Sequence, residues 1–511
     1  MSLPTITVIT TTNPILIVTL FMTFISVTYG IFLLLLLGLY WIIPGKSWRL
    51  FILLISSLLF YSTLQIQYIP LLLLWTVFNF GLALTIVEPQ EWEIPHISWN
   101  RRRTFLLILG IIINILILVG FKYLPFIFNT LGTLWNIPII INTGSWIDQY
   151  VIAPLGLSFF CFELIAYLVD VYRGAPAATS LLEFTAYKLF FAKLISGPIT
   201  RYHHLNNQFK TLKFPIPEQI ADGLWLLARG AMKKGLLADN IGILVDLSFS
   251  NLQRAGSGDL WLAIFAYGLQ LYLDFSGYVD LARGTALLLG LTLPINFDSP
   301  YFSTSIGDFW RRWHITLGDW LRNYLYFPLG GSRVGLFRTC LNLILVMLIA
   351  GIWHGAAWGF IIWGGLHGLA LVVNRLTEAL SKQLSITWIW NSLPGILIAW
   401  LITQLMVFTT WIFFRLPNLQ DSWLVINRLW GHTADVQFAH KVYVEALGLE
   451  RHHLVILLSS VFGLMAITNL LNRGLKLELN WTVKLALVPL SFFTVWLLAP
   501  AGGLPYIYFD F

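Results

Sequence analysis

Residues 31–39 read IFLLLLLGL, a run without one charged or hydrogen-bonding side chain. The strands of a membrane barrel alternate between polar and apolar positions, and this run does not alternate. A segment in lipid must satisfy its own backbone hydrogen bonds, which an α-helix does within one stretch of chain. The run therefore predicts a membrane-spanning helix.

The composition extends this prediction to the whole chain. Of the 511 residues, 58% are hydrophobic and only 11% are charged, whereas a soluble domain carries about 25% charged residues. One crossing needs roughly 20 apolar residues, and many such runs follow one another. We predict an all-α polytopic integral membrane protein with about 11 transmembrane helices. Re-entrant and interfacial helices are expected to surround a central, water-accessible cavity.

The charges indicate an orientation. The net charge of +7 is attributed to basic loops that meet membrane lipid, not to a nucleic-acid partner. Lys46 and Arg49 lie two spans before Arg101–Arg103, so both basic loops fall on one face, which the positive-inside rule makes cytoplasmic. We expect a multi-pass protein of the cell (inner or plasma) membrane with an extracytoplasmic N-terminus. Cys161 and Cys340 lie in apolar runs and predict neither a disulfide framework nor a metal site.

The chain divides into three predicted regions. Residues 1–150 hold N-terminal transmembrane helices, beginning with a span from Pro14 to Ile43. Residues 151–415 form a central core that contains the motifs described below, and residues 416–511 hold a C-terminal loop and further transmembrane helices. Between Leu181 and Leu260 the apolar runs are short and interrupted by lysine and arginine. Such pieces predict re-entrant helices around a water-accessible cavity, because broken backbone at membrane depth needs protein or water around it.

The densest polar cluster is residues 307–333, GDFWRRWHITLGDWLRNYLYFPLGGSR. Its helical part is too polar to face lipid on every side, and Trp with Arg suits an interface or a cavity wall. An amphipathic helix lying on the cytoplasmic membrane surface explains the same pattern equally well. If the cluster lines a tunnel, the candidate tunnel residues in it are Trp313, His314, Asp319, Arg322, Asn323 and Tyr324.

A second motif is residues 351–368, GIWHGAAWGFIIWGGLHG. Its glycines recur at four-residue spacing, which lets helices approach closely. His354 lies inside this stretch, with Trp353 beside it as a candidate tunnel residue. Desolvation disfavours the charged imidazole, so His354 is predicted to be neutral and able to accept a proton, as a general base must. A buried histidine that only bonds a neighbouring helix fits equally well, and we interpret His367 as structural.

The apolar run near 261–291 carries three ionisable residues. Asp280 and Arg283 are three positions apart, so we predict that they pair on one helix face. Asp274 has no charged partner nearby in the sequence and is a candidate tunnel residue, as is Tyr278, four positions later. Ionisable groups at membrane depth are costly, which makes such positions functional candidates.

Seven stretches resemble, in order, the motifs of the membrane-bound O-acyltransferase (MBOAT) family, in its bacterial branch of alginate O-acetylases and D-alanine transfer proteins. They are APLGLSFFCFELIAYLVDVYRG (153–174), KLISGPITRY (193–202), GAMKKGLLADN (230–240), LDFSGYVDLARG (273–284), INFDSPYFSTSIGDFWRRWHITLGDWLRNYLYFPLGG (295–331), GIWHGAAWGFIIWGGLHG (351–368) and PYIYFDF (505–511). The resemblance implies the family's fold, a catalytic histidine at His354, and a second polar tunnel residue at His314. The chain departs from the branch at Glu163, where glutamine is usual, and at Lys193.

The resemblance implies transfer of an acyl group, for which we expect acetyl, from a cytoplasmic thioester such as acetyl-CoA. The acceptor would be a hydroxyl of an extracytoplasmic polysaccharide or carrier, and a periplasmic or secreted partner protein would complete the transfer. D-alanyl or peptidoglycan acyl transfer are alternatives within the fold. A transporter also fits intramembrane charges and broken helices, although the hydropathy has no inverted repeat. We expect no bound cofactor and no metal, and neither a G-x-S-x-G elbow nor a P-loop is present.

Overall fold

The computed structural model describes residues 22–87 and 101–509. In these residues the regular structure is helical, with one isolated antiparallel bridge between Phe297 and Trp313 and no strand. The predicted all-α class is therefore confirmed. The first described helix begins at Val27, and the predicted start of that span at Pro14 lies outside the described residues.

The N-terminal helices are α1 (Val27–Ile42), α2 (Lys46–Gln65), α3 (Ile69–Ile86), α4 (Arg101–Leu118), α5 (Leu124–Trp135) and α6 (Pro138–Tyr150). The middle of the chain forms α7 (Leu157–Tyr172), α8 (Leu181–Lys188), α9 (Phe191–Leu194), α10 (Tyr202–Lys210), α11 (Pro217–Ala231), α12 (Asp239–Phe249), α13 (Ser257–Leu288), α14 (Ile306–Arg312) and α15 (Ile315–Leu321). The C-terminal helices are α16 (Leu336–His354), α17 (Trp358–Gln383), α18 (Thr387–Asn391), α19 (Leu393–Arg415), α20 (Leu419–Arg428), α21 (Val436–Ala439), α22 (Arg451–Asn469) and α23 (Trp481–Leu498). Short helical turns complete them: η1 (Ile66–Tyr68), η2 (Val119–Tyr123), η3 (Met232–Ala238), η4 (Pro300–Phe302), η5 (Arg322–Tyr326), η6 (His440–Ala446), η7 (Leu470–Gly474) and η8 (Ile507–Phe509).

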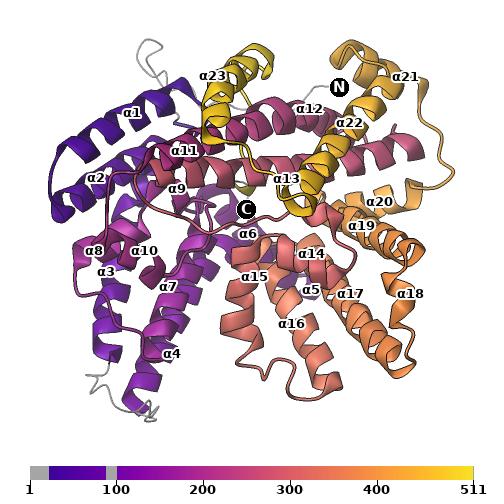
Figure 1. The fold of residues 1–511 in the computed structure, drawn as a ribbon. Coiled ribbons are helices and arrows are strands. Elements are labelled where there is room, and N and C mark those ends of the chain that lie inside the picture. The colour runs from indigo at the N-terminus through magenta and orange to yellow at the C-terminus, as the bar shows by residue number, and fades with distance from the viewer. Residues whose placement is uncertain (1–21, 88–100, 510–511) are drawn as a thin grey trace.

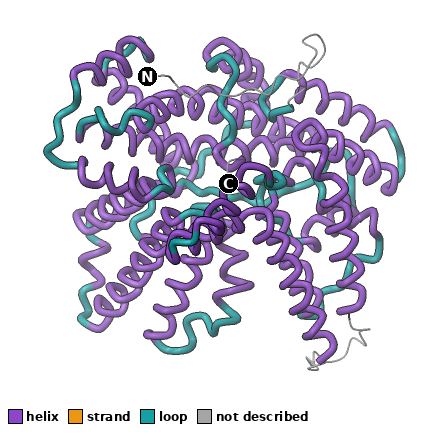
Figure 2. The backbone as a smooth tube through the Cα atoms, turned by 180° about the vertical axis from the view of Figure 1, so that it is seen from behind, coloured by secondary structure: helices purple, strands orange, loops and turns teal. Residues whose placement is uncertain are grey.

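The helices form two groups joined by a layer across the molecule. In Figure 1, α3, α4 and α7 stand together on one side and α15, α16 and α17 on the other, while α11, α12 and α13 run across the top. Figure 2 shows the same two groups from behind, with loops only between helices. The candidate site lies where these groups meet, because α7, α13 and α16 each contribute residues to it.

Seven helical stretches of the described chain are long and apolar enough to cross a membrane. They are Lys46–Ile86, Arg101–Trp135, Leu336–His354, Trp358–Gln383, Leu393–Arg415, Arg451–Gly474 and Trp481–Leu498. This finding supports a polytopic protein but does not confirm the predicted count of about 11. The outer helices keep apolar side chains on their surface, and α23 has no buried residue at all, as expected of a helix that faces lipid.

Helices α7 and α13 form the interior instead. Most side chains of both helices are buried, so their polar groups meet protein rather than lipid. Glycines allow α11 to press against α13: a Cβ atom at Gly230 would lie 2.7 Å from the carbonyl oxygen of Gly277. The predicted glycine contact in residues 351–368 also forms, since a Cβ at Gly351 would lie 2.2 Å from the carbonyl oxygen of Phe360.

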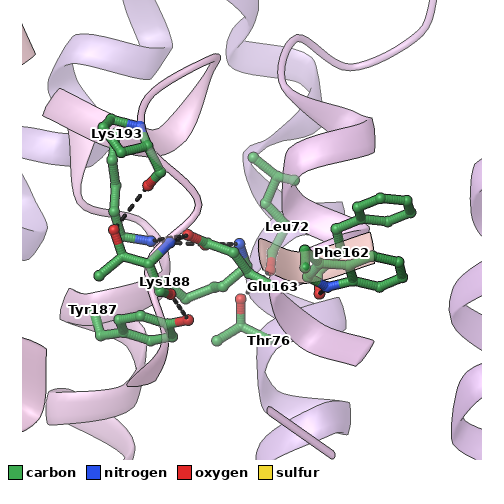
Figure 3. A network of polar contacts seen from close by, with 10 residues as sticks. Leu72, Thr76, Phe162, Glu163, Tyr187, Lys188 and Lys193 are labelled. Carbon is green, nitrogen blue, oxygen red and sulfur yellow. Dashed lines mark hydrogen bonds and ion pairs between the residues drawn. The ribbon is translucent and has the colours of Figure 1, made fainter. Parts of the chain in front are cut away.

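The interior contains a buried charge cluster, the Glu163 cluster, made of Glu163, Lys188 and Lys193. Both ammonium groups lie 2.7 Å from a carboxylate oxygen of Glu163, which also accepts a hydrogen bond from the backbone N–H of Thr200. Figure 3 shows the two lysines converging on this one carboxylate from separate short helices. The two positions at which we expect the chain to depart from the family branch are thus partners of each other.

Two predictions about the middle of the chain need correction. Residues 181–210 are indeed short helices, but residues 217–249 form one continuous helix, with η3 as a π-helical turn between α11 and α12. The predicted Asp280–Arg283 pair is wrong. Asp280 binds Arg229 at 2.7 Å and Lys233 at 2.8 Å, because α11 packs alongside α13 and presents closer cations than the same helix does.

Candidate active site

His314 and His354 lie in the interior of the protein and share two aromatic neighbours, Tyr508 and Trp353. The centroid of the Tyr508 ring lies 6.2 Å from that of His314 and 5.9 Å from that of His354. The indole of Trp353 lies 6.0 Å and 4.9 Å from the same two imidazoles. Both histidines are almost completely buried, with exposed fractions of 0% and 2%. The structure thus brings together the two residues, 40 positions apart, that the family resemblance singled out.

His314 lies between α14 and α15 in a left-handed backbone conformation, with φ 45° and ψ 54°. A residue with a Cβ atom adopts this conformation only where its surroundings hold it there. Asn296 stabilises this conformation, because its backbone carbonyl oxygen accepts the N–H of Ile315 at 3.0 Å. Its side-chain Oδ1 accepts the N–H and the hydroxyl of Thr316, both at 3.0 Å.

The same Oδ1 of Asn296 fixes the tautomer of His314. It lies 3.3 Å from Nδ1 of the imidazole and must be the amide oxygen, because the backbone N–H of Thr316 donates to it. An amide oxygen only accepts, so Nδ1 of a neutral His314 carries the proton and Nε2 carries the lone pair. Nε2 is buried and has no hydrogen-bond partner among the described residues. The ring therefore offers one free acceptor nitrogen to the site.

His354 is the last residue of α16, and the chain continues from it in extended conformation at Gly355. The end of a helix leaves carbonyl groups without intrahelical partners. Lys122 binds two of them: its ammonium donates to the carbonyl oxygens of Trp353 at 2.7 Å and His354 at 3.1 Å. A cation at this end also interacts favourably with the negative end of the helix dipole. The Nδ1 atom of His354 is buried and finds no partner in the part of the chain that the structure describes.

Aromatic rings enclose both imidazoles. Phe275 packs against His314 with ring centroids 4.9 Å apart, and Trp363 packs against His354 at 5.2 Å. Phe159 lies 5.0 Å from Trp353 and 6.1 Å from His314. No carboxylate within the described ranges pairs with either imidazole. A dry site without a counter-charge favours neutral histidines, and neutral histidines can accept protons.

Two cavities lie at opposite ends of α7. The Lys122 cavity, of about 570 Å³, is lined by Lys122, Gly355 and Phe414 and lies beside the N-terminal end of α7, where Ser158 bonds the same ammonium. Phe414 packs directly on His354, with ring centroids 5.1 Å apart.

The Tyr324 cavity, of about 330 Å³, lies at the other end of α7. It is lined by Thr316, Asp319, Trp320, Asn323 and Tyr324, and the Tyr324 hydroxyl bonds Asp170 near the end of the helix. Thr316 connects this cavity to His314 through Asn296. Phe414 therefore lies between the Lys122 cavity and His354, and Thr316 and Asn296 lie between the Tyr324 cavity and His314.

The other predicted tunnel residues lie at several different positions. Arg322 forms an exposed ion pair with Asp319 at 3.0 Å, at the surface beside the Tyr324 cavity. Trp313 has no ring contact with either histidine among the described residues and packs one ring further out, 5.2 Å from Trp411, which in turn lies 5.3 Å from Phe414. Asp274 does have a charged partner, Lys234, at 2.7 Å.

The side chains of Asp274 and Tyr278 each accept a hydrogen bond from a backbone N–H group of another segment. Asp274 accepts the N–H of Ile507, so it fixes the segment that carries Tyr508. The Tyr278 hydroxyl binds the backbone N–H of Ser196. His367 bonds at both ring nitrogens, with Trp310 and Thr410, as a structural residue does.

The sequence did not single out three residues of this site: Asn296, Lys122 and Tyr508. Asn296 and Tyr508 lie in stretches quoted for the family resemblance, but nothing in their spacing placed them beside a histidine. Lys122 carried a signal that could have been used, since a lone lysine in a long apolar run needs a buried partner. Across the described chain, no group of three or more His, Cys, Asp or Glu side chains could hold a metal ion.

The family model for MBOAT, the membrane-bound O-acyltransferase family, matches residues 58–412. The chain belongs to this family. The matched range includes both histidines, both cavities in large part and the Glu163 cluster. Together with the apolar helices, the match identifies a multi-pass membrane protein of an acyltransferase family.

Known relatives agree with this assignment. The chain is 38% identical over 382 residues to a probable alginate O-acetylase, AlgI, of Pseudomonas aeruginosa, covering 74% of this chain and 68% of that protein. It is 38% identical over 378 residues to a peptidoglycan O-acetyltransferase of Helicobacter pylori, covering 69% and 68%. A teichoic acid D-alanyltransferase of Streptococcus thermophilus is 30% identical over 233 residues, covering 43% and 56%.

Proposed function

We propose that the protein transfers an acetyl group from a thioester donor to a hydroxyl of a polysaccharide outside the cell membrane, with His354 as the general base. One observation carries this proposal. Two buried imidazoles, each with an unpartnered ring nitrogen among the described residues, lie between cavities at the two ends of α7. Two substrates arriving from opposite ends would meet at these rings.

The proposed reaction balances without a further reagent. His354 takes the proton of the acceptor hydroxyl, and the oxygen attacks the carbonyl carbon of the thioester. The tetrahedral intermediate collapses as the C–S bond breaks, and the proton held by His354 passes to the departing thiolate. General-base assistance contributes about 10²- to 10⁴-fold to such a step. The aromatic walls exclude water, which limits hydrolysis of the donor.

The negative charge on the carbonyl oxygen needs a hydrogen-bond donor. The tautomer that Asn296 imposes leaves Nε2 of neutral His314 without a proton, so this nitrogen can accept a hydrogen bond from the acceptor hydroxyl and can donate to the oxyanion only when it is protonated. The indole N–H of Trp353 is buried and has no partner within the described ranges. We assign it as the donor to the developing oxyanion, a role worth about 2.7–4 kcal/mol in enzymes where such donors have been removed.

The charge distribution supports an orientation for the two substrates. Arg103 donates to the carbonyl oxygen of Tyr172 at 3.1 Å, so the basic loop that is expected in the cytoplasm lies at the Tyr324 end of α7. In the proposal, the thioester donor enters from this cytoplasmic end and the acceptor from the Lys122 end. The protein is then a cell-membrane enzyme with its N-terminus outside.

The names of the relatives support the choice of acetyl. The proteins named for O-acetylation of alginate and peptidoglycan share 38% identity over more than two thirds of this chain. The relative named for D-alanyl transfer shares 30% identity over 43% of it. We therefore favour acetyl-CoA as donor and a polysaccharide as acceptor, with a secreted or periplasmic partner protein that completes transfer.

The test is acetyl transfer in membrane vesicles with labelled acetyl-CoA. We expect His354→Ala to abolish acylation at normal abundance, since no other group replaces the base. His440→Ala is a matched control, because His440 is exposed and lies outside the site; it should keep full activity. Near-normal transfer by His354→Ala at normal expression would refute the mechanism.

A further inference from the structure

A third cavity, of about 400 Å³, lies apart from the two at the ends of α7. We name it the Arg283 cavity. It is bounded by α11 with η3, by the C-terminal half of α13, by the C-terminal half of α22 and by the loop around Phe297. The proposed reaction assigns no role to its charged lining.

The lining carries more positive than negative charge. Its cations are Arg229, Lys233, Arg283 and Arg473, and its carboxylates are Asp280 and Asp298. Arg229 and Lys233 both pair with Asp280, so one negative charge faces two positive charges there. Asp298 lies 3.6 Å from Arg473. Two cationic charges therefore remain without a matching carboxylate in the wall, which favours an anionic ligand.

Arg283 is the cation that is free to bind such a ligand. It forms no ion pair within the described parts of the chain, since the neighbouring Asp280 is taken by other partners. Within the described residues its one hydrogen bond runs from Nε to the carbonyl oxygen of Leu293 at 3.4 Å. The remaining N–H groups of a guanidinium present a fork that matches the oxygens of a phosphate.

A second observation points to a ligand with oxygen acceptors. Asn296 also lines the Arg283 cavity and is only 1% exposed, and its Nδ2 has no hydrogen-bond partner among the described residues. A buried amide N–H₂ without a partner is costly, so a ligand oxygen at this place would remove that cost. The other end of the same amide holds His314, so the cavity is one side chain away from the histidine pair.

The opposite wall is apolar. Val461, Leu464 and Met465 of α22 contribute it, on a helix that otherwise carries apolar side chains on its surface. A small inorganic anion would not use this wall. A phosphate ester on an amphiphilic molecule would use both walls, with its phosphate at Arg283 and its less polar part against α22.

We propose that the Arg283 cavity binds the phosphate ester of an amphiphile, with Arg283 as the principal phosphate ligand. Two sources share this chemistry: the phosphates of a coenzyme A thioester and the head group of a membrane phospholipid. The proposal concerns binding and does not depend on which histidine acts as base.

The experiment measures binding to the full chain in nanodiscs, without transfer. One arm measures the affinity for coenzyme A and for pantetheine, which lacks the phosphates. The other arm measures phosphatidylglycerol retained by protein purified from vesicles of phosphatidylglycerol and phosphatidylethanolamine. The variants are Arg283→Gln and Arg283→Lys, and the control is Arg338→Gln, which removes an exposed arginine outside the cavity.

Loss of a charge-assisted hydrogen bond predicts weaker binding on the order of 10- to 100-fold in Arg283→Gln. A coenzyme A source is supported if affinity for coenzyme A falls while that for pantetheine does not. A lipid source is supported if retained phosphatidylglycerol falls while coenzyme A affinity is unchanged. Arg283→Lys should bind with intermediate affinity, because it keeps the charge and loses the fork. Unchanged binding in both arms, or equal losses in Arg338→Gln, overturns the proposal.

Discussion

Replacing Asn296 by leucine tests whether the orientation of His314 matters for the reaction. The substitution preserves the approximate size of the side chain and removes Oδ1. That oxygen accepts three contacts: the N–H and the hydroxyl of Thr316, both at 3.0 Å, and Nδ1 of His314 at 3.3 Å. The backbone contact from Asn296 to Ile315 is retained, so the local fold is expected to survive.

The expected loss of stability follows from the hydrogen-bond donors that lose their acceptor. The Thr316 N–H and His314 Nδ1–H are both buried, and each unsatisfied donor costs about 1–3 kcal/mol. We therefore expect Asn296→Leu to lower the free energy of unfolding by about 2–6 kcal/mol. A hydrogen bond worth about 1 kcal/mol also favours the Nδ1-protonated tautomer, so its loss lowers the ratio of this tautomer to the Nε2-protonated one by about fivefold. Through the tautomer alone, the kcat should fall by up to about that factor.

Asn296→Asp is the informative companion. A carboxylate can accept the same three contacts, so the ring orientation is kept. Its charge favours the protonated form of His314, and the rising limb of the pH–rate profile should move to higher pH. Thr316→Val is the comparison variant, because it removes the hydroxyl and keeps the contact between Oδ1 of Asn296 and His314. That hydroxyl also accepts the N–H of Ile199 at 3.1 Å, so the substitution should cost about 1–3 kcal/mol.

The assay combines initial rates of acetyl transfer across pH with thermal unfolding of each purified variant. Wild-type kcat and an unchanged pH profile in Asn296→Leu, at equal abundance, would refute the orienting role of Asn296. So would a Thr316→Val variant that loses as much activity as Asn296→Leu, since the tautomer would then not be the cause.

Three further predictions concern the supports of the site. Glu163→Gln leaves Lys188 and Lys193 buried without their carboxylate and should lower the free energy of unfolding by about 3–5 kcal/mol. Thermal unfolding in detergent measures this loss, and the triple variant that also carries Lys188→Met and Lys193→Met should recover most of it. Lys122→Met leaves two carbonyl groups at the end of α16 without a hydrogen-bond donor. It should lower the free energy of unfolding by about 1–3 kcal/mol and should also lower kcat. Unchanged values of both quantities would contradict the role of Lys122. Tyr508→Ala opens the wall beside both imidazoles and should raise hydrolysis of acetyl-CoA relative to transfer; an unaltered ratio would show that this ring does not exclude water.

The helical class followed from the sequence because its physical cause is local. A run such as residues 31–39 cannot satisfy its backbone in lipid except as a helix, whatever surrounds it. The glycine spacing of residues 351–368 is equally local, and the contact that it predicts forms. The same logic failed for Asp280, because spacing along one helix shows which residues can pair but not which cations a neighbouring helix brings closer.

The site itself was only partly accessible to such reasoning. His314 and His354 were marked by motifs, whereas the residues that orient and enclose them come from other parts of the chain. Asn296 reaches His314 through a non-helical loop, and Tyr508 comes from the C-terminal segment, held by Asp274. No periodicity predicts such contacts, because they depend on how loops cross between helices and not on the repeat of a helix.

The positions of the two histidines have a common physical logic. His354 is the last residue of α16 and His314 directly precedes α15, so both lie where the chain leaves a helix and backbone groups need other partners. Lys122 satisfies the carbonyls at one break, and Asn296 satisfies the N–H groups at the other. Both imidazoles are almost completely buried, so protein side chains supply those partners. The side chains that make the breaks tolerable are therefore the ones that fix the imidazoles, so stability at these breaks and reactivity should be lost together.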